Sequence, residues 1–353
     1  MTMIRLSLVL VFLIALIACS EEPSDEGAYH HARRGFRNVD SNPDTGLWGF
    51  LKWRWERMVK HVPDPASYSF PVAENDPHFL RSNRTQTTLT WIGHATVLLQ
   101  VRGRNVLTDP HFSKRASPVQ WAGPKRVVPP GLAPRDLPAI DAVVISHDHY
   151  DSLDAPSIRM LLRREGGKET VFFVPLGLAK WFRDAGAVRI VELDWWQSHR
   201  EDDLRFTAVP VHHWSKRGLI GRNKTLWAGW VVEAPDFKFF FAGDSGYKPI
   251  FQEIGRRLGP FDLAAIPIGA YEPRWFMKYH HMSPEEAVKV HQDVKAKQSV
   301  AIHWGTFMLT DEPLDEPPKR LREALKDMGV PNDEFLALRH GETIFLDPDP
   351  GFQ

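Results

Sequence analysis

The chain has 353 residues, enough to bury one large hydrophobic core or two smaller ones. Its 44 Lys and Arg balance its 44 Asp and Glu, so the net charge gives no case for a nucleic-acid partner. Only one cysteine is present, which excludes an internal disulfide, and a metal site in this chain must therefore use histidine and carboxylate ligands.

The first residues are typical of a secretory signal. An apolar run over residues 6–17 is too short for an ordinary membrane span of about 20 residues. It ends in Leu16-Ile-Ala-Cys19, which resembles the bacterial lipobox, where the cysteine is lipidated; a plain signal peptide with a chance cysteine is the alternative. We therefore predict a signal peptide over residues 1–18, lipidation of Cys19 and a lipid-anchored protein of the bacterial cell envelope. Ser20, in place of the aspartate that signals inner-membrane retention, favours the periplasmic side of the outer membrane.

The next segments connect this anchor to a folded domain. Residues 19–45 are mostly polar and are predicted to be a tether, and residues 46–353 are predicted to be the domain. The segment Gly46–Met58 is dense in Trp and Arg. We interpret it either as a membrane-facing helix or, the favoured alternative, as an aromatic segment that packs back onto the domain.

Beyond residue 87 the hydrophobic pattern predicts strands first and then strands mixed with helices, which indicates a layered α/β domain. The clearest helix start is Ser283 with Glu286 three residues later, a capping box. In chain order we expect strands over 88–92, 96–101 and 105–108, a proline-rich loop over 118–138, a helix over 155–165, a strand over 171–174, a helix over 176–185, strands over 188–193, 204–211, 225–233 and 237–242, a helix over 251–258, a strand over 263–268, a helix over 284–295, a strand over 299–302, a helix over 318–328 and a short last strand ending at residue 345.

The stretch Ser146–Asp154 is the strongest candidate for a functional site. It places His147, His149 and Asp151 at two-residue intervals directly after an apolar strand. An extended loop directs alternate side chains to the same side, so two imidazoles and a carboxylate converge. These are zinc ligands, and the spacing therefore predicts part of a zinc site.

Three later strands also end in candidate ligands. His213 follows the strand that ends at Val211, Asp244 follows Phe241, and His303 follows Ile302. Loops at strand ends converge in layered α/β proteins, where sites usually form. Each residue alone has an ordinary alternative, such as a surface histidine or a turn aspartate, but together they predict one metal centre.

These residues and several literal stretches resemble the metallo-β-lactamase superfamily and, more closely, its N-acyl-phosphatidylethanolamine-hydrolysing phospholipase D branch. The resemblance covers about residues 85–346, and the Tyr271–Tyr279 run is its most specific part. The matching stretches include Trp91-Ile-Gly-His-Ala-Thr-Val97, Thr108-Asp-Pro110, Gly123-Pro-Lys-Arg126, Glu192-Leu-Asp-Trp-Trp196, Phe239-Phe-Phe-Ala-Gly-Asp244, Gly259–Tyr279 and Ala301-Ile-His-Trp-Gly-Thr-Phe307.

The resemblance implies a four-layer αβ/βα sandwich with two zinc ions between its sheets, and relatives of this kind imply a homodimer. The first zinc would be held by His147, His149 and His213, the second by Asp151 and His303, and Asp244 would bridge the two. Three residues would act in catalysis, namely Asp151, Asp244 and His281.

Residues beyond the ligands also match this branch. Tyr150 and His281 match positions that line the substrate site, and His281 would contact phosphate oxygens or protonate the leaving alkoxide. Asp109 is either a group that fixes a ligand imidazole or simply a turn residue before Pro110.

One position departs from the family's pattern. The family motif continues Asp-His-Leu-Asp, with the histidine as a further ligand of the second zinc, whereas this chain has Asp151-Ser152-Leu-Asp154. A serine hydroxyl is a poor zinc ligand, and the loss should cost at least about 10–100-fold in affinity for the second metal. Three outcomes stay open: water fills the gap, a harder metal binds, or the protein works with one zinc or not at all.

We therefore expect a zinc-dependent phosphodiesterase of phospholipase D type. A metal-activated hydroxide would hydrolyse N-acyl-phosphatidylethanolamine or a related phospholipid at a membrane surface to phosphatidic acid and an N-acylethanolamine. One alternative is a lactonase or esterase of the same fold acting on a phosphorylated small molecule. The other is a catalytically impaired, lipid-binding envelope lipoprotein, because Ser152 replaces a ligand.

Overall fold

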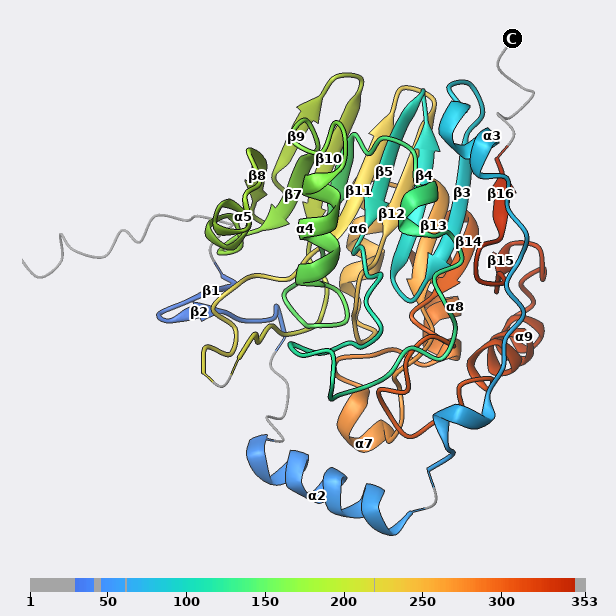
Figure 1. Ribbon diagram of the computed structural model, residues 1–353. Helices are drawn as coiled ribbons and strands as arrows, with labels where there is room; N and C mark the ends of the chain where they lie inside the picture. The colour runs from blue at the N-terminus through green and yellow to red at the C-terminus, as the bar shows by residue number, and fades with distance from the viewer. Residues whose placement is uncertain (1–28, 41–45, 61, 219, 347–353) are drawn as a thin grey trace, which may run out of the picture.

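The computed structural model describes residues 29–40, 46–60, 62–218 and 220–346, and within them two seven-stranded sheets face each other (Figure 1). The first sheet has the order β16(Thr343–Phe345), β3(Thr88–Gly93), β4(Thr96–Val101), β5(Arg104–Thr108), β6(Ala142–Val144), β7(Val171–Pro175), β8(Arg189–Leu193). The second has the order β15(Phe335–Leu336), β14(Ala296–Ile302), β13(Phe261–Pro267), β12(Phe237–Phe241), β11(Gly229–Ala234), β10(Leu204–Val209), β9(Ser198–Glu201).

Both faces of the first sheet are buried, which explains its continuous apolar strands. In β4, Val97 and Leu99 point into the core between the sheets, while Leu98 points outward. This outer face packs against Leu80, Ile158 and Phe182 from three helices. The helices are α3(Pro77–Ser82), α4(Ala155–Arg163) and α5(Ala179–Ala185).

The second sheet is covered on its outer side by α6(Ile250–Arg257), α8(Pro284–Asp293) and α9(Pro317–Asp327). The predicted capping box at the start of α8 is present, with Ser283 and Glu286 satisfying each other's backbone N–H. Helix, sheet, sheet and helix thus make four layers, and the predicted αβ/βα sandwich is confirmed.

Element boundaries differ from the prediction where local pattern and tertiary pairing disagree. The strand predicted over 225–233 begins only at Gly229, and the helix predicted over 176–185 begins at Ala179. Strand β9 was not predicted, because Ser198-His-Arg-Glu201 is a polar, exposed edge strand without apolar alternation.

The predicted tether differs from the structure over residues 29–40. A short hairpin of β1(His31–Ala32) and β2(Gly35–Phe36) packs on the domain. His30 is buried with its Nε2 atom 2.5 Å from Asp194 Oδ1, and Asn38 Nδ2 donates to the His213 carbonyl at 2.8 Å. This part of the chain therefore belongs to the domain, because it satisfies buried polar groups there. The predicted signal peptide and Cys19 lie outside the described residues.

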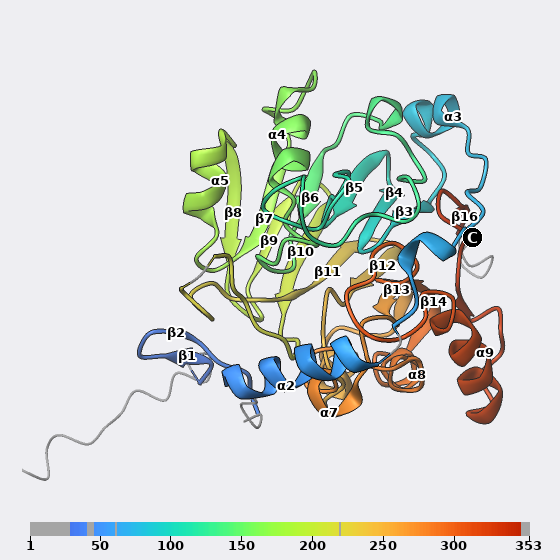
Figure 2. The ribbon, with the colours of Figure 1, turned by 60° about the horizontal axis from the view of Figure 1, so that its bottom comes forward.

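Helix α2(Gly46–Val59) lies along the surface beside α7(Arg274–Met277) (Figure 2). Its Trp53 ring stacks on Phe276 with centroids 5.5 Å apart and is only 9% exposed, so the favoured prediction that this segment packs back is confirmed for one face. The opposite face is open: Trp48 is 83% and Trp55 65% exposed. Among the described residues, no helix combines the length and apolar character needed to span a bilayer.

Candidate metal centre

The predicted ligands lie in loops at the ends of strands from both sheets. His147, His149 and Asp151 come from the loop between β6 and α4. His213 follows β10, Asp244 follows β12 and His303 follows β14. The parallel strands β5–β7 and β12–β14 direct their carboxyl ends to this side of the sandwich, which is why residues far apart in sequence meet there.

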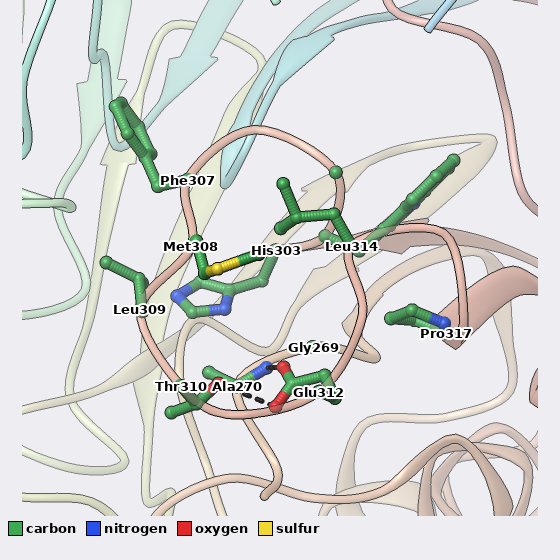
Figure 3. A pocket seen from close by; sticks show the side chains of 12 residues that line it. Gly269, Ala270, His303, Phe307, Met308, Leu309, Thr310, Glu312, Leu314 and Pro317 are labelled. Atoms are coloured by element: carbon green, nitrogen blue, oxygen red, sulfur yellow. Dashed lines mark hydrogen bonds between the residues drawn. The ribbon is translucent and has the colours of Figure 1, made fainter. Parts of the chain in front are cut away.

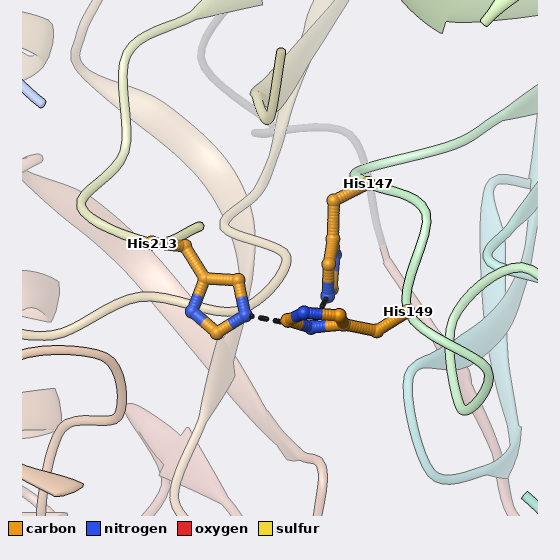
Figure 4. Close-up of side chains that lie close together, drawn as sticks. All are labelled: His147, His149 and His213. Atoms are coloured by element: carbon orange, nitrogen blue, oxygen red, sulfur yellow. Dashed lines mark hydrogen bonds between the residues drawn. The ribbon is translucent and has the colours of Figure 1, made fainter. Parts of the chain in front are cut away.

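The first cluster consists of His147, His149 and His213 (Figure 4). His149 Nδ1 lies 2.8 Å from His147 Nε2 and 3.2 Å from His213 Nε2. Burial lowers the pKa of all three, that of His149 to about 4, so the imidazoles are neutral at pH 7. Three neutral imidazole nitrogens converging on one point are a zinc ligand set.

Hydrogen bonds to the outer nitrogens orient two of these rings. His213 Nδ1 lies 2.9 Å from the His280 carbonyl, to which it donates. His147 Nδ1 lies 2.8 Å from Ser146 Oγ, whose hydroxyl donates in turn to Asp109. Asp109 therefore acts on the ligand through Ser146 rather than directly, and each arrangement leaves Nε2 free to bind a metal ion.

Asp244 lies between the first cluster and His303. Its Oδ2 atom is 3.2 Å from His303 Nε2 and 3.7 Å from His147 Nε2. Although burial raises the pKa of Asp244, His303 and the other imidazoles hold it below its ordinary value. Both of its buried oxygens lack a hydrogen bond of good geometry within the described part of the chain. A buried, ionised carboxylate of this kind fits a metal ion, because an uncompensated charge there is costly.

The second cluster consists of His94, Asp151 and His303. His303 Nε2 lies 3.4 Å from Asp151 Oδ2. Burial lowers the pKa of His303, but Asp244 and Asp151 outweigh it and raise the pKa to about 10, so this position favours positive charge. His94 was not predicted as a ligand, although it lies inside the quoted Trp91–Val97 stretch. The match of that stretch to the family was the one sequence signal that could have pointed to His94.

The predicted substrate-side residues lie at the edge of the two clusters. The His281 ring centroid is 5.1 Å from that of His213 and 5.5 Å from that of His303. Burial lowers the pKa of His281 to about 4, so its imidazole is neutral. Tyr150 is half-buried beside His149 and stacks under Arg217, whose guanidinium carbon lies 4.5 Å from the ring centroid.

A small cavity of about 10 Å³ lies behind His303, with room for about one water molecule (Figure 3). On its floor, the buried Glu312 carboxylate accepts from Ala270 N at 2.6 Å and from Thr310 Oγ1 at 2.7 Å. The cavity is far too small for a phospholipid. These contacts fix the loops around His303.

Two facing mixed sheets with buried His and Asp clusters at their strand ends are the architecture of the metallo-β-lactamase fold. A family model described as "Beta-lactamase superfamily domain" matches residues 104–304. The chain belongs to the metallo-β-lactamase superfamily.

Within that superfamily the chain is similar to N-acyl-phosphatidylethanolamine-hydrolysing phospholipases D. It is 45% identical over 247 residues to N-acyl-phosphatidylethanolamine-hydrolyzing phospholipase D 1 of Caenorhabditis elegans, covering 67% of this chain and 69% of that protein. It is 32% identical over 265 residues to the mitochondrial enzyme of that name from Saccharomyces cerevisiae, covering 73% of this chain and 56% of that protein. Among solved structures, a possible metal-dependent hydrolase from Veillonella parvula shares the fold with a TM-score of 0.58 and 19% identity, covering 74% of this chain and all of that one (100%).

Proposed function

We propose that the protein is a zinc-dependent phosphodiesterase of phospholipase D type. Its substrate would be N-acyl-phosphatidylethanolamine or a related phospholipid, and its products phosphatidic acid and an N-acylethanolamine. The observation that carries the proposal is the pair of His and Asp clusters joined by Asp244, in a chain 45% identical to an enzyme named for this reaction.

The chain offers separate residues for two metal positions. His147, His149 and His213 would hold one ion, Asp151 and His303 the other, and Asp244 would be shared. Zinc is the metal we propose, because nitrogen-rich sets with a carboxylate suit it. Two zinc ions would lower the pKa of a water molecule to about 7 and neutralise charge on the phosphodiester.

The remaining groups bind and orient the substrate. A neutral His281 donates a hydrogen bond to a phosphate oxygen or to the leaving oxygen, since its ring lies next to both His213 and His303. The Trp214 ring packs edge-on against His149 at a centroid distance of 4.3 Å and so helps to hold this imidazole in place.

Helix α2 supports a membrane surface as the place where the substrate is met. Trp48, Leu51, Trp55 and Met58 follow one another at three- and four-residue spacing on its outer face, and Met58 is 80% exposed. Lys52 and Arg54 on this helix, and Lys60 directly after it, are also exposed, which suits anionic headgroups.

The place of α2 in the fold links this face to the clusters. The helix packs on α7, and four residues beyond the end of α7 the chain reaches His281. The predicted lipid on Cys19 would hold the same face against a bilayer of the cell envelope, because only residues 20–45 separate it from α2.

Vesicles that contain N-acyl-phosphatidylethanolamine test the proposal, with both products measured by mass spectrometry. The zinc-loaded protein should release phosphatidic acid and N-acylethanolamine in equal amounts. A His147→Ala/His149→Ala variant should lose both this release and bound zinc. His212→Ala is the matched control, because His212 directs Nδ1 to the Tyr279 carbonyl at 2.8 Å and belongs to neither cluster.

Two outcomes would contradict the proposal. If the double variant still hydrolyses the lipid, the metal centre takes no part in the reaction. A wild-type protein that cleaves soluble phosphorylated lactones or esters, but no vesicle lipid, would favour the alternative small-molecule hydrolase.

A further inference from the structure

The loop that supplies three ligands continues with Ser152, where the family's pattern has a metal-binding histidine. The Ser152 side chain is fully buried, and its Oγ atom has no hydrogen-bond partner among the described residues. Without a replacement, the second metal position would keep only Asp151, His303 and the shared Asp244. The structure brings another imidazole to this place.

That imidazole belongs to His94, in the turn between β3 and β4 of the first sheet. Its Nε2 atom lies 3.2 Å from Asp151 Oδ2, the same oxygen that lies 3.4 Å from His303 Nε2. The rings of His94 and His303 have centroids only 4.0 Å apart. Two imidazole nitrogens from distant loops are thus directed at one carboxylate oxygen.

The arrangement repeats what is seen in the first cluster. There, neutral imidazole nitrogens approach one another to 2.8 and 3.2 Å. His94 is likewise buried, at 1% exposure. The nitrogen lone pair of an imidazole is a metal ligand, and His94, Asp151 and His303 each direct one ligand atom to the same place.

The backbone holds His94 in place against local preference. His94 and His303 both have positive φ angles, 55° and 62°, a conformation that is uncommon for non-glycine residues. Their main chains are joined directly, because His303 N donates to the His94 carbonyl at 2.9 Å, and His94 N donates to Thr306 Oγ1 at 2.8 Å. Movement of one histidine therefore displaces the other.

We propose that His94 replaces the missing histidine of position 152 as a ligand of the second metal ion. The ligands of that ion are then His94, Asp151, His303 and the shared Asp244, with the same number and kinds of donor atoms as in the family's pattern. The inference rests on the two-metal centre of the proposed function. Ser152 marks a relocated ligand and not a disabled site.

Metal counting tests the inference without any substrate. The purified protein is freed of metal with a chelator and dialysed against buffered Zn²⁺. Its zinc content per folded chain is then measured by mass spectrometry. Wild type should bind two equivalents. His94→Ala and the bulkier His94→Gln should each bind one, with affinity for the second ion reduced at least about 10–100-fold.

His111→Ala is the matched control. The His111 ring is equally buried, and both histidine rings pack on Phe307, with centroids 4.8 Å away for His111 and 5.1 Å for His94. His111 belongs to neither cluster, so its variant should keep two equivalents at a similar loss of packing. The double variant His94→Ala/Ser152→His should regain the second equivalent, because it restores the family's donor set.

The inference is overturned if folded His94→Ala and His94→Gln still bind two zinc ions, or if His111→Ala loses the second ion equally. In either case His94 only orients Asp151. If the wild-type protein binds two zinc ions through His94 but releases no phosphatidic acid, the proposed substrate is wrong and the assignment of His94 as a ligand still holds.

Discussion

The hydrogen-bond chain from Asp109 through Ser146 to His147 makes Ser146→Ala an informative substitution. Ser146 Oγ accepts from His147 Nδ1 at 2.8 Å and donates to Asp109 Oδ2 at 2.5 Å, and all three side chains are buried. Alanine keeps the Ser146 N–H bond to Asp109 Oδ1 but leaves His147 Nδ1 and one carboxylate oxygen without this partner. Each unsatisfied buried group costs about 1–3 kcal/mol, so for the two groups we expect a loss of about 2–6 kcal/mol in unfolding free energy.

The same substitution should weaken the first metal position. Removing the group that orients a ligand imidazole typically costs about 10–100-fold in metal affinity, which corresponds to about 1.4–2.7 kcal/mol. Zinc competition with a fluorescent chelator measures this loss, and urea unfolding of the metal-free protein measures stability separately.

Ser245→Ala provides the comparison for Ser146→Ala. Ser245 is a buried serine at the same end of the sandwich that accepts from His212 N at 2.9 Å and touches no ligand imidazole. The Ser245→Ala substitution should destabilise the fold without changing zinc affinity by more than about twofold. If Ser146→Ala binds zinc as tightly as Ser245→Ala does, the proposed orienting role of the Asp109–Ser146 pair is wrong.

Two further substitutions address the surface of the molecule. Trp55→Ser should weaken binding to anionic vesicles about tenfold in a sedimentation assay and leave hydrolysis of a soluble substrate unchanged. Phe345→Ser is the control, because Phe345 is an exposed aromatic residue on β16, and it should leave vesicle binding unchanged. If both substitutions weaken vesicle binding equally, α2 does not face the bilayer. Asp194→Ala should release the N-terminal hairpin and speed amide hydrogen exchange over residues 30–38. Burial raises the pKa of Asp194, but hydrogen bonds from His30 and His31 hold it below its ordinary value. The contribution of Asp194 to stability is therefore present above about pH 4 and is lost as the pH falls through the lowered pKa; unfolding free energies that fall equally in wild type and Asp194→Ala would contradict this.

The sequence alone predicted those features that depend only on the spacing of residues close together in the chain. The two-residue interval from His147 to Asp151 after an apolar strand predicts convergent ligands, because an extended loop alternates its side chains. The capping box at Ser283 is equally local. The literal match to a known family added the four-layer αβ/βα sandwich and the roles of distant ligands, which spacing does not contain.

Only the tertiary structure decided how distant segments meet. Asp151 and His94 are 57 positions apart, and no periodicity connects them, yet strand pairing in the first sheet brings their side chains to 3.2 Å. The polar strand β9 and the docked hairpin at His30 are likewise held by partners elsewhere in the chain. The sequence shows that a ligand is missing at Ser152, whereas finding an imidazole nearby requires the fold, because a metal site depends on distances in space.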